Sequence, residues 1–503
     1  MSEEGLALGE RPEYLKEGEE ARLIPAGAAT QREKFACSVL MASLHVVQPF
    51  ARAFFGDIGW RVGNWAEVKG YTEPVFKRQP DGLVCRPDGL LILHTGRRER
   101  RLLVETKIGS AKIDPFQIAQ YAQLARVNDV EAILTVSNEL STDPTLSPYR
   151  IPPEIRGLPI FHWSWPSLVS RAELVLVEEE ESFDREQEYI LREIIRYFDH
   201  ETAGVSLNMH MCSDWANIVE QIQGHAPLSS KDPCVLNVVQ CWHQQLASIC
   251  ISKTRELKLP VTLDLPNSHW DQQVRLEDDV AEFVDSHQLW ATFKFATQAR
   301  PIALVADAVR RNVTCSLSLD APLDRQTYRS RVRWLLNQLP EDLPRDARID
   351  VFWDRNQRSS AWLSEFQEDL DAARIDSPSG PRGFEIVYVA DLANRFAGTR
   401  SFVPALADAL TEFYEHIAQY IRAWQPRASS DTAREQTDVR DDVAAATRRH
   451  IKKSGEIDGR TFSIFDDGSI EVETGRGIQR FNSFAELSAA ARNGQTRPGS
   501  PSL

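Results

Sequence analysis

The chain has 503 residues, more than one ordinary hydrophobic core accommodates, which predicts two or three domains. Its hydrophobic fraction of 42% and charged fraction of 26% are typical of a soluble globular protein. No apolar run approaches the ~20 residues that cross a bilayer, and the acidic N-terminus does not resemble a secretion signal, so no membrane partner is expected. Seven scattered cysteines, an odd number, predict reduced thiols in a cytoplasmic protein.

The net charge of -15 argues against a nucleic-acid partner, but the charge is unevenly distributed along the chain. Residues 1–30 carry about -4, residues 31–175 about +3 and the remainder about -14. Contact with phosphate depends on local positive surface rather than on the charge of the whole chain. Residues 31–175 are therefore the part that could tolerate a polyanion.

The first part of the chain is expected to be a flexible leader followed by a mixed domain. Residues 1–29 are polar and rich in Gly and Glu, which is typical of a flexible segment. In the domain over 30–180, apolar residues spaced near 3.6 predict a helix over Thr30–Phe55 and a second over Pro115–Arg126. Strands are expected at Gly89–His94, Leu102–Ile108, Ala132–Val136 and Ile160–Trp163, so the class is α/β or mixed α+β.

The rest of the chain is expected to hold a second mixed domain and a small β module. The glutamate run Glu178–Glu181 predicts a solvated joint, after which a helix over Arg185–Phe198 opens a mixed α/β domain over 185–427. Further helices are expected at Cys234–Lys258, Tyr328–Leu339 and Val403–Trp424, and strands at Thr314–Leu319, Ile349–Phe352 and Glu385–Val389. A linker is predicted over 428–455, a β-hairpin module around Asp466-Asp467-Gly468 over 456–492, and a disordered tail over 493–503.

One segment, residues 85–109, carries a pattern that folding alone does not require. It is predicted to form a hairpin with its turn at Thr95–Arg98. The residue numbers of any two residues that face each other across the hairpin then add up to about 193. Asp88 then lies opposite Glu105, and strand alternation places Glu105 and Lys107 on one face. Two carboxylates and a lysine are therefore expected to converge at the open end of the hairpin.

Two carboxylates and a lysine are groups that metal-dependent phosphodiester cleavage can use. Carboxylates supply the oxygen ligands that Mg²⁺ prefers. The cation stabilises charge that develops on phosphate and lowers the pKa of a bound water. A lysine two residues along the strand can hold the attacking water or stabilise the charged transition state.

Pro87-Asp88, followed at hairpin distance by Glu105-Thr106-Lys107, resembles the PD-(D/E)xK nuclease superfamily of restriction and RecB type. The resemblance covers about residues 30–170 and implies a restriction-endonuclease-like N-terminal core with Asp88, Glu105 and Lys107 as catalytic residues. It implies Mg²⁺ or Mn²⁺ held by Asp88, Glu105 and the backbone carbonyl of Thr106.

The helix after the hairpin extends the resemblance. Gln117 and Tyr121 match the Gln-xxx-Tyr motif of RecB-like members, where these side chains orient DNA and support the site. Family members often add an acid from the first helix, and Glu33 is the match in this chain. Alternatively, Glu33 is a first-turn acid favoured by the helix dipole, with Glu67 or Glu73 in its role, and Gln117 and Tyr121 line an interface.

The resemblance implies a cytoplasmic metal-dependent nuclease, a hydrolase of phosphodiester bonds, that acts on DNA rather than RNA. The added domains are expected to recognise a target, a protein partner or a second copy of the chain. By analogy alone, this organisation is similar to bacterial antiviral defence proteins. The competing hypotheses are a catalytically inactive nuclease-fold adaptor that binds nucleic acid or protein, and a surface hairpin with a cross-strand salt-bridge cluster.

A second Pro-Asp-Gly, with Asp81, competes with Asp88. Pairing Asp81 with Glu105 would centre the turn at residue 93, inside an apolar run, so Asp88 is preferred and Asp81 is assigned to a turn. The basic run Arg97, Arg98, Arg100 and Arg101 is interpreted as a soluble loop in preference to a phosphate track.

Three further patterns are assigned structural roles. Trp163 and Trp165 are expected to pack in the core rather than stack on bases. Arg325, Arg329 and Arg333 are expected to form a solvated helix face rather than a phosphate grip. A zinc site is not favoured, because paired Cys-xx-Cys spacing is missing from His210, Cys212, Cys234, Cys241 and His243.

Overall fold

The computed structural model describes residues 11–25 and 31–424, with short gaps at 64–65, 81, 83–84, 97, 142, 156, 179–182, 299, 341–345 and 378, and four strands between 451 and 481. The chain divides into two compact units, Met1–Trp424 and Gln425–Leu503. Several predicted features lie outside the described residues: the start of the leader, Asp81, Arg97, most of the glutamate run, the linker up to 450, the turn at 466–468 and the tail.

The first unit begins with a six-stranded sheet in the order β1-β2-β3-β4-β5-β6. Strands β1 to β4 pair in antiparallel fashion, whereas β4, β5 and β6 run parallel. Helix α3 (Pro115–Val127) makes the crossover between β4 and β5. The strands are β1 (Leu15–Glu20), β2 (Glu67–Phe76), β3 (Gly89–Thr95), β4 (Arg98–Thr106), β5 (Ala132–Ser137) and β6 (Ile160–Ser164). The expected mixed α/β class is confirmed.

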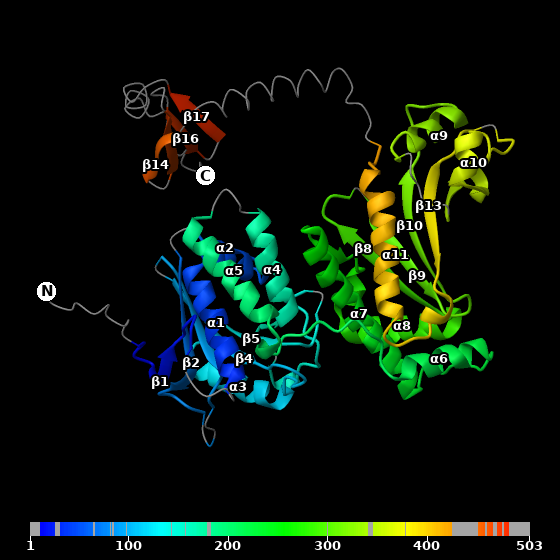
Figure 1. Ribbon diagram of the computed structural model, residues 1–503. Helices are drawn as coiled ribbons and strands as arrows, with labels where there is room; N and C mark the ends of the chain where they lie inside the picture. The colour runs from blue at the N-terminus through cyan, green and yellow to red at the C-terminus, as the bar shows by residue number, and fades with distance from the viewer. Residues whose placement is uncertain are drawn as a thin grey trace, which may run out of the picture. The chain divides into compact units, whose positions relative to one another are not determined.

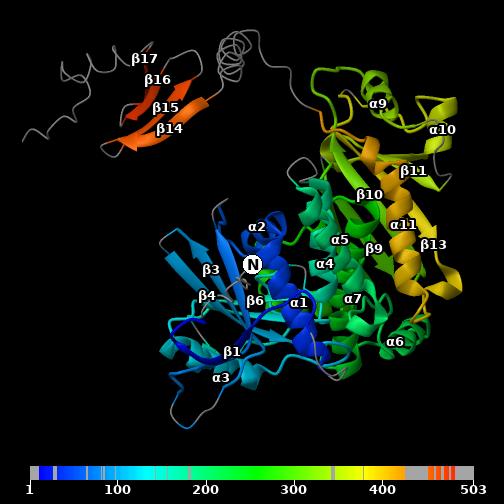
Figure 2. The ribbon, with the colours of Figure 1, turned by 60° about the vertical axis from the view of Figure 1, so that its left-hand side comes forward.

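Helices cover both faces of this sheet. One face packs against α1 (Arg32–Val46), α2 (Gln48–Asp57), α4 (Trp165–Glu178) and α5 (Arg185–Asp199). The other face packs against α3, so the sheet separates two hydrophobic cores (Figures 1 and 2). Alternate side chains of β4 supply the two cores: Val104 enters the first, and Leu103 enters the second beside α3.

Three expectations for this region are wrong. Residues 15–20, assigned to a flexible leader, form edge strand β1, because Leu15 is buried and the segment pairs with β2. The single helix expected over Thr30–Phe55 breaks at Val47, since Pro49 cannot donate a backbone hydrogen bond into a continuing helix. Helix α5, assigned to the second domain, buries Leu191 and Phe198 in the first core.

The predicted register of the β3–β4 hairpin is confirmed. Pairing runs from Gly89 opposite Val104 to Thr95 opposite Arg98. Gly96 in the turn has a φ of +63°, a conformation that glycine adopts without steric cost. Asp88 and Glu105 come next at the open end of the hairpin, because the pairing is in register to its last residue.

A second sheet, of seven strands, follows in the same unit, and all its neighbouring strands are antiparallel. Its order is β12-β11-β13-β10-β9-β8-β7. The strands are β7 (Val261–Leu263), β8 (Gln288–Phe295), β9 (Ile302–Asp307), β10 (Asn312–Asp320), β11 (Ala347–Phe352), β12 (Arg358–Trp362) and β13 (Gly383–Asp391).

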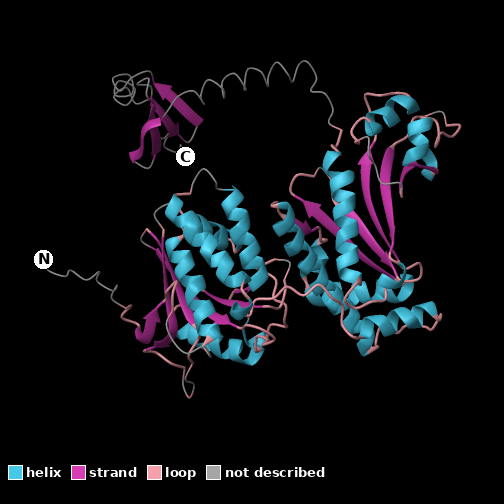
Figure 3. Cartoon of the chain, in the orientation of Figure 1, coloured by secondary structure: helices cyan, strands magenta, loops and turns pink. Residues whose placement is uncertain are grey.

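Six helices accompany the second sheet, and each contributes buried side chains to one shared core. Figure 3 shows the two sheets, each with its own helices. The helices are α6 (Asp214–Gln223), α7 (Pro233–Leu257), α8 (Gln272–Ser286), α9 (Tyr328–Leu336), α10 (Leu363–Glu368) and α11 (Phe402–His416). The helix expected to reach Trp424 ends instead at His416.

Helix α7 also contacts the first sheet's helices and loops. The amide of Gln244 exchanges hydrogen bonds of 2.9 Å with the backbone of Leu140. Arg255 forms ion pairs with Glu173 at 2.7 Å and Asp199 at 2.8 Å, and Lys258 reaches Glu173 at 2.8 Å. The two sheets therefore belong to one unit.

The second unit contains a four-stranded antiparallel sheet in the order β14-β15-β16-β17. The strands are β14 (Ile451–Ile457), β15 (Arg460–Phe465), β16 (Ile470–Thr474) and β17 (Gly477–Phe481). The predicted hairpin is confirmed by the pairing of Phe462 with Val472. The predicted end of the linker at residue 455 is wrong, since β14 begins at Ile451.

Among the described residues, no single helix is long and apolar enough to cross a membrane. Helices α1 and α2 reach that length and composition as a pair, bent by 108° at their junction.

Candidate functional site: a buried carboxylate cluster

Asp88 is fixed against the end of β4 by Thr106. The backbone N–H of Thr106 donates to Asp88 Oδ2 at 2.8 Å, and the Thr106 hydroxyl donates to the same oxygen at 3.0 Å. Strand β3 begins at the following residue, so the hairpin register places the Asp88 carboxylate beside the end of β4.

Glu105 is buried inside the first sheet, with its side chain 1% exposed. The ammonium group of Lys107 donates to Glu105 Oε1 at 2.6 Å, and the Tyr121 hydroxyl donates to Oε2 at 2.9 Å. Both partners lie on the α3 face of the sheet, as alternation along β4 predicts. The carboxylate therefore meets a cation on one oxygen and a neutral donor on the other.

Helix α3 presents Gln117 and Tyr121 to this carboxylate. The Gln117 amide donates to the Tyr121 hydroxyl at 2.7 Å, as expected for side chains one helical turn apart. Asp114 caps the helix by accepting from the N–H of Phe116 at 2.9 Å. The hydrogen bonds from Gln117 to Tyr121 and from Tyr121 to Glu105 link α3 to the site. Side chains that only line an interface would not need these bonds.

Lys107 is held by its own backbone as it leaves the sheet. Its N–H donates to the carbonyl of Val136 at 2.8 Å, and its carbonyl accepts from the indole N–H of Trp165 at 2.8 Å. The ammonium group also lies 3.1 Å from the carbonyl oxygen of Thr106 and 3.7 Å from Glu33 Oε2. Lys107 thus contacts one proposed carbonyl ligand and two of the proposed acids.

The charges in this cluster shift each other's protonation. Burial, reinforced by the charge of Asp88, raises the pKa of Glu105 to about 7. Burial also raises the pKa of Asp88, although the Thr106 backbone hydrogen bond opposes the shift. Burial lowers the pKa of Lys107, but the hydrogen bond and charge of Glu105 outweigh it, so the net shift is upward. The cluster holds more negative than positive charge.

Tight packing of α1 on β3 brings the first helix to the site. A Cβ on Gly89 would lie 2.8 Å from Met41 Sδ, so glycine permits this approach. The N-terminal turn of α1 then places Glu33 beside Lys107.

The alternatives to Glu33 occupy other positions. Glu67 pairs with His94 at the turn end of the hairpin, five residues along β2 from Thr72, whose partner Gly89 follows Asp88. Glu73 lies near the site, since its N–H donates to the carbonyl of Asp88 at 2.9 Å. Its carboxylate, however, forms a 2.5 Å ion pair with Lys34. Of the three acids, Glu33 is the one in contact with Lys107.

The basic run lies at the turn of the hairpin, at the opposite end of β4 from Glu105. Arg98 and Arg100 both pair with Glu131, at 3.3 and 2.8 Å, and Arg101 pairs with Glu99 at 2.6 Å. The predicted loop is wrong for Arg98, Arg100 and Arg101, because these residues belong to strand β4 and pair within the fold.

Most other residues of interest pack or pair within the fold. Trp163 and Trp165 are 6% and 0% exposed and belong to the first core, as expected. Arg329 pairs with Asp371 in the proposed arginine face. Within the zinc candidate set, the N–H of Cys212 contacts Cys241 Sγ at 3.1 Å, whereas His243 bonds Asp279 at 2.6 Å.

A search of the described residues finds no group of three or more His, Cys, Asp or Glu side chains arranged to hold a metal ion. Glu33 lies 3.7 Å from the ammonium group of Lys107. Comparison of the chain with protein-family models, with curated proteins and with solved structures gives no match.

Two supports of the site were not predicted. Thr106 was considered for its carbonyl oxygen, yet its N–H and hydroxyl anchor Asp88. Trp165 was assigned to the core, yet its indole N–H also holds Lys107. Alternation along β4 could have suggested neither contact, because each depends on the meeting of separate segments.

Proposed function

We propose that the first sheet and its helices form a metal-dependent nuclease core of the restriction-endonuclease-like kind. One observation carries the proposal: two acids and a lysine lie together at the open end of a single hairpin, and one of the acids is buried beside a second negative charge. Burial of like charges without a counterion destabilises the folded state. A hairpin with a purely structural role would have no need for such an arrangement.

The residues present fit a hard divalent cation. Asp88, Glu105 and the carbonyl of Thr106 offer oxygen donors, which Mg²⁺ and Mn²⁺ prefer. Burial raises the pKa of Glu105, and the charge of Asp88 adds to that rise, so a cation bound beside the two carboxylates would stabilise their charged forms. When bound, the cation would supply charge neutralisation at phosphate and a more acidic water.

The chain's own side chains have separate tasks in this proposal. Lys107 places a positive charge beside Glu105, where it can hold the attacking water or face the negative charge that develops on phosphate. Tyr121, backed by Gln117, orients one oxygen of Glu105 and leaves the other to Lys107. Glu33, near Lys107, is proposed to orient that ammonium group or to complete the acid set.

DNA is the proposed substrate, and residues 31–175 have the charge balance that tolerates a polyanion. The second sheet and the β14–β17 module are proposed to recognise a target, a protein partner or a second copy. A role in defence against foreign DNA follows as the biological setting, by analogy.

The test is incubation of the purified full chain with plasmid, linear and single-stranded DNA and with RNA, in Mg²⁺, Mn²⁺ or EDTA. Cleavage in either metal that stops in EDTA and in Lys107→Ala is the expected result. Intact substrates in both metals, with a folded protein, would overturn the proposal.

One observation favours a second candidate, an inactive nuclease-fold adaptor. Glu105 is occupied by Lys107 and Tyr121, and no group of three candidate metal-ligand side chains is found among the described residues. An adaptor would bind nucleic acid or protein with equal strength in Mg²⁺ and in EDTA, and Glu105→Gln would leave that binding unchanged.

A further inference from the structure

The second sheet has one apolar face and one polar face. Along β10, Val313, Cys315, Leu317 and Leu319 enter the core shared with the helices. The residues between them are small or polar and point to the opposite face, where Ser318 and Asp320 are exposed. The helices that contact the sheet bury side chains in that core, whereas the described residues at this end of β10 leave the opposite face exposed at Ser318 and Asp320.

A hollow of about 280 Å³ opens on this polar face near the ends of β10, β11 and β13. Gly383 creates it: pairing places this glycine between Asp320 on β10 and Phe352 on β11, and it fills no space between them. A Cβ on Gly383 would lie 2.8 Å from the carbonyl oxygen of Leu319, so the close backbones require glycine. The lining residues are Arg300, Ser318, Leu319, Asp320, Phe352, Arg382, Gly383 and Phe384.

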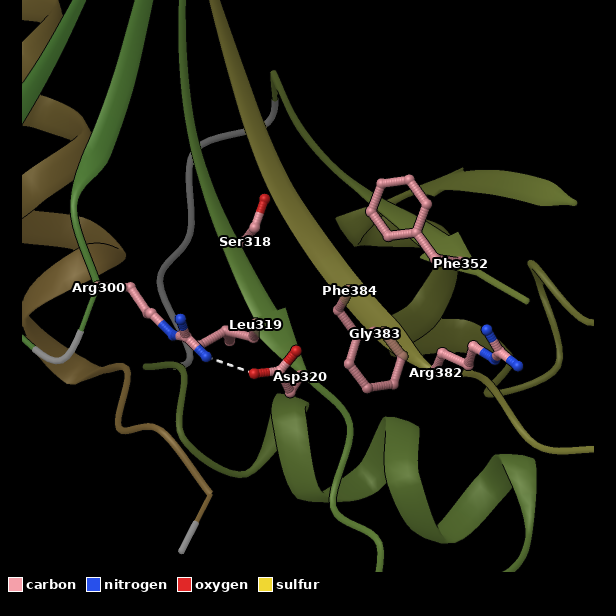
Figure 4. A pocket seen from close by; sticks show the side chains of 8 residues that line it. All are labelled: Arg300, Ser318, Leu319, Asp320, Phe352, Arg382, Gly383 and Phe384. Atoms are coloured by element: carbon pink, nitrogen blue, oxygen red, sulfur yellow. Dashed lines mark hydrogen bonds and ion pairs between the residues drawn. The ribbon is translucent and has the colours of Figure 1, made fainter. Parts of the chain in front are cut away.

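The lining combines an aromatic ring with two guanidinium groups. Figure 4 shows Arg300 on one side of Gly383 and Arg382 on the other, with Phe352 above them. Arg358 lies over the Phe352 ring, 5.6 Å from its centroid, and also pairs with the buried Asp350. Asp350 thereby holds the Arg358 guanidinium group in place beside the ring.

Both rim arginines are available to an anion. Arg300 pairs with Asp320 and Arg382 pairs with Asp354, and these arginine side chains are 46% and 72% exposed. Exposed ion pairs contribute little to stability, because water screens them. A phosphate group, which accepts paired hydrogen bonds from guanidinium, can therefore replace either carboxylate.

We propose that this hollow binds a nucleotide, with the base against Phe352 and the phosphate on Arg300 and Arg382. Aromatic stacking and arginine–phosphate contact are the two interactions that nucleotide recognition shares across single-stranded sites. The volume lies just below the ~300–1,000 Å³ of typical small-molecule pockets, which suits one nucleotide. The nucleotide is either free or part of a single strand, and the two sources share this chemistry. The site is separate from Asp88 and Glu105, so it does not depend on cleavage.

The test measures binding by the full chain in EDTA, so that no strand is cut. Calorimetric titrations use the four ribonucleoside 5′-monophosphates, the matching nucleosides and inorganic phosphate, and anisotropy uses a labelled twelve-residue oligothymidylate. Phe352→Ala is expected to weaken nucleotide binding about tenfold, the scale of one lost stacking contact, with Phe352→Leu between it and wild type. Arg382→Glu is expected to weaken the binding of monophosphates about tenfold. The same variant should bind nucleosides within about twofold of the wild-type affinity.

Arg310→Glu is the matched control. Arg310 is 75% exposed and pairs with Asp307 at 3.7 Å, at the β9–β10 turn near the other end of these strands. The Arg310→Glu variant should bind nucleotides with the wild-type affinity. Binding of monophosphates identifies a free nucleotide as the source, and binding of the oligomer alone identifies a strand.

Two results would overturn the proposal: neither ligand class binds wild type, or Phe352→Ala and Arg382→Glu bind as wild type does. A change of oligomeric state in these variants, without any nucleotide binding, would assign the face to a second copy instead. Loss of cleavage in Asp88→Asn with nucleotide binding retained would show that the two sites stand independently.

Discussion

Two buried carboxylates, one in each large sheet, meet different surroundings. Glu105 in β4 and Asp350 in β11 are both 0% exposed. Asp350 is paired with two guanidinium groups, those of Arg348 and Arg358. Glu105 has one cation, Lys107, and burial, reinforced by the negative charge of Asp88, raises its pKa to about 7. A buried charge that its neighbours balance serves the structure, whereas an excess of buried negative charge is suited to binding a cation.

The largest expected difference between the two carboxylates is in catalysis. Under the proposed function, Glu105→Gln and Asp88→Asn remove the proposed metal ligands, and Lys107→Ala removes the positive charge proposed to face the phosphate, so each should reduce cleavage at least ~10³-fold. Initial rates on plasmid and single-stranded DNA measure the effect. Asp350→Ala should retain the wild-type rate per folded molecule.

Asp81→Ala is a second control for this experiment and should cleave normally. If it is inactive while Asp88→Asn is active, the two acids exchange roles. Equal losses in Asp350→Ala and Glu105→Gln would remove the distinction between the two sheets.

The free energy of unfolding should also distinguish the two carboxylates, with the larger loss now expected at Asp350. Asp350→Ala removes the buried acceptor of two arginines whose side chains are 36% and 47% exposed, and loss of such charged hydrogen bonds costs about 1–3 kcal/mol. Glu105→Gln removes a repelled charge, so the metal-free protein should be as stable as wild type or more so. Urea unfolding without metal, followed by circular dichroism, makes the comparison. A loss of several kcal/mol in Glu105→Gln would assign that residue to structure.

The pH dependence of stability should identify Glu105 itself. Its pKa is about 7 in the folded protein against 4.5 in the reference state, so the folded state binds the proton more tightly. The contribution of Glu105 to stability is then fully present below pH 4.5 and is lost as pH rises from 4.5 to 7, by at most about 3.4 kcal/mol without metal. Glu105→Gln should lack this component of the slope between pH 4.5 and 7. An unchanged slope would place the titrating group elsewhere.

The smallest expected effect is stabilisation by metal. A cation at ten times its Kd that binds only the folded state adds about 1.4 kcal/mol, which raises the Tm by a few degrees. The shift in Mg²⁺ or Mn²⁺ should be larger at pH 8 than at pH 6, because Glu105 must lose its proton. Thermal melts of wild type and Glu105→Gln test it. Equal shifts in the two proteins would mean that the ions bind elsewhere.

The parts of the site that sequence predicted are those that local geometry determines. A turn and strand alternation place Asp88, Glu105 and Lys107, and helical periodicity places Gln117 beside Tyr121. Edge strand β1 was missed because its residues Leu15–Glu20 alternate poorly and gain their burial from β2, about fifty residues later. The two arginine partners of Asp350 were missed for a similar reason, since Arg358 comes from the neighbouring strand.

The contacts of helix α7 limit how the first sheet and its helices can be recombined with other domains. Glu173 is largely buried, with its side chain 14% exposed, and its partners Arg255 and Lys258 come from α7. A graft that ends after α5 would carry this carboxylate without either cation and would expose the apolar contact of Leu140 with Ala247 and Ile251. Exchange of domains at this boundary therefore requires compensating substitutions at Glu173 and Leu140, so the first sheet is not a freely exchangeable module.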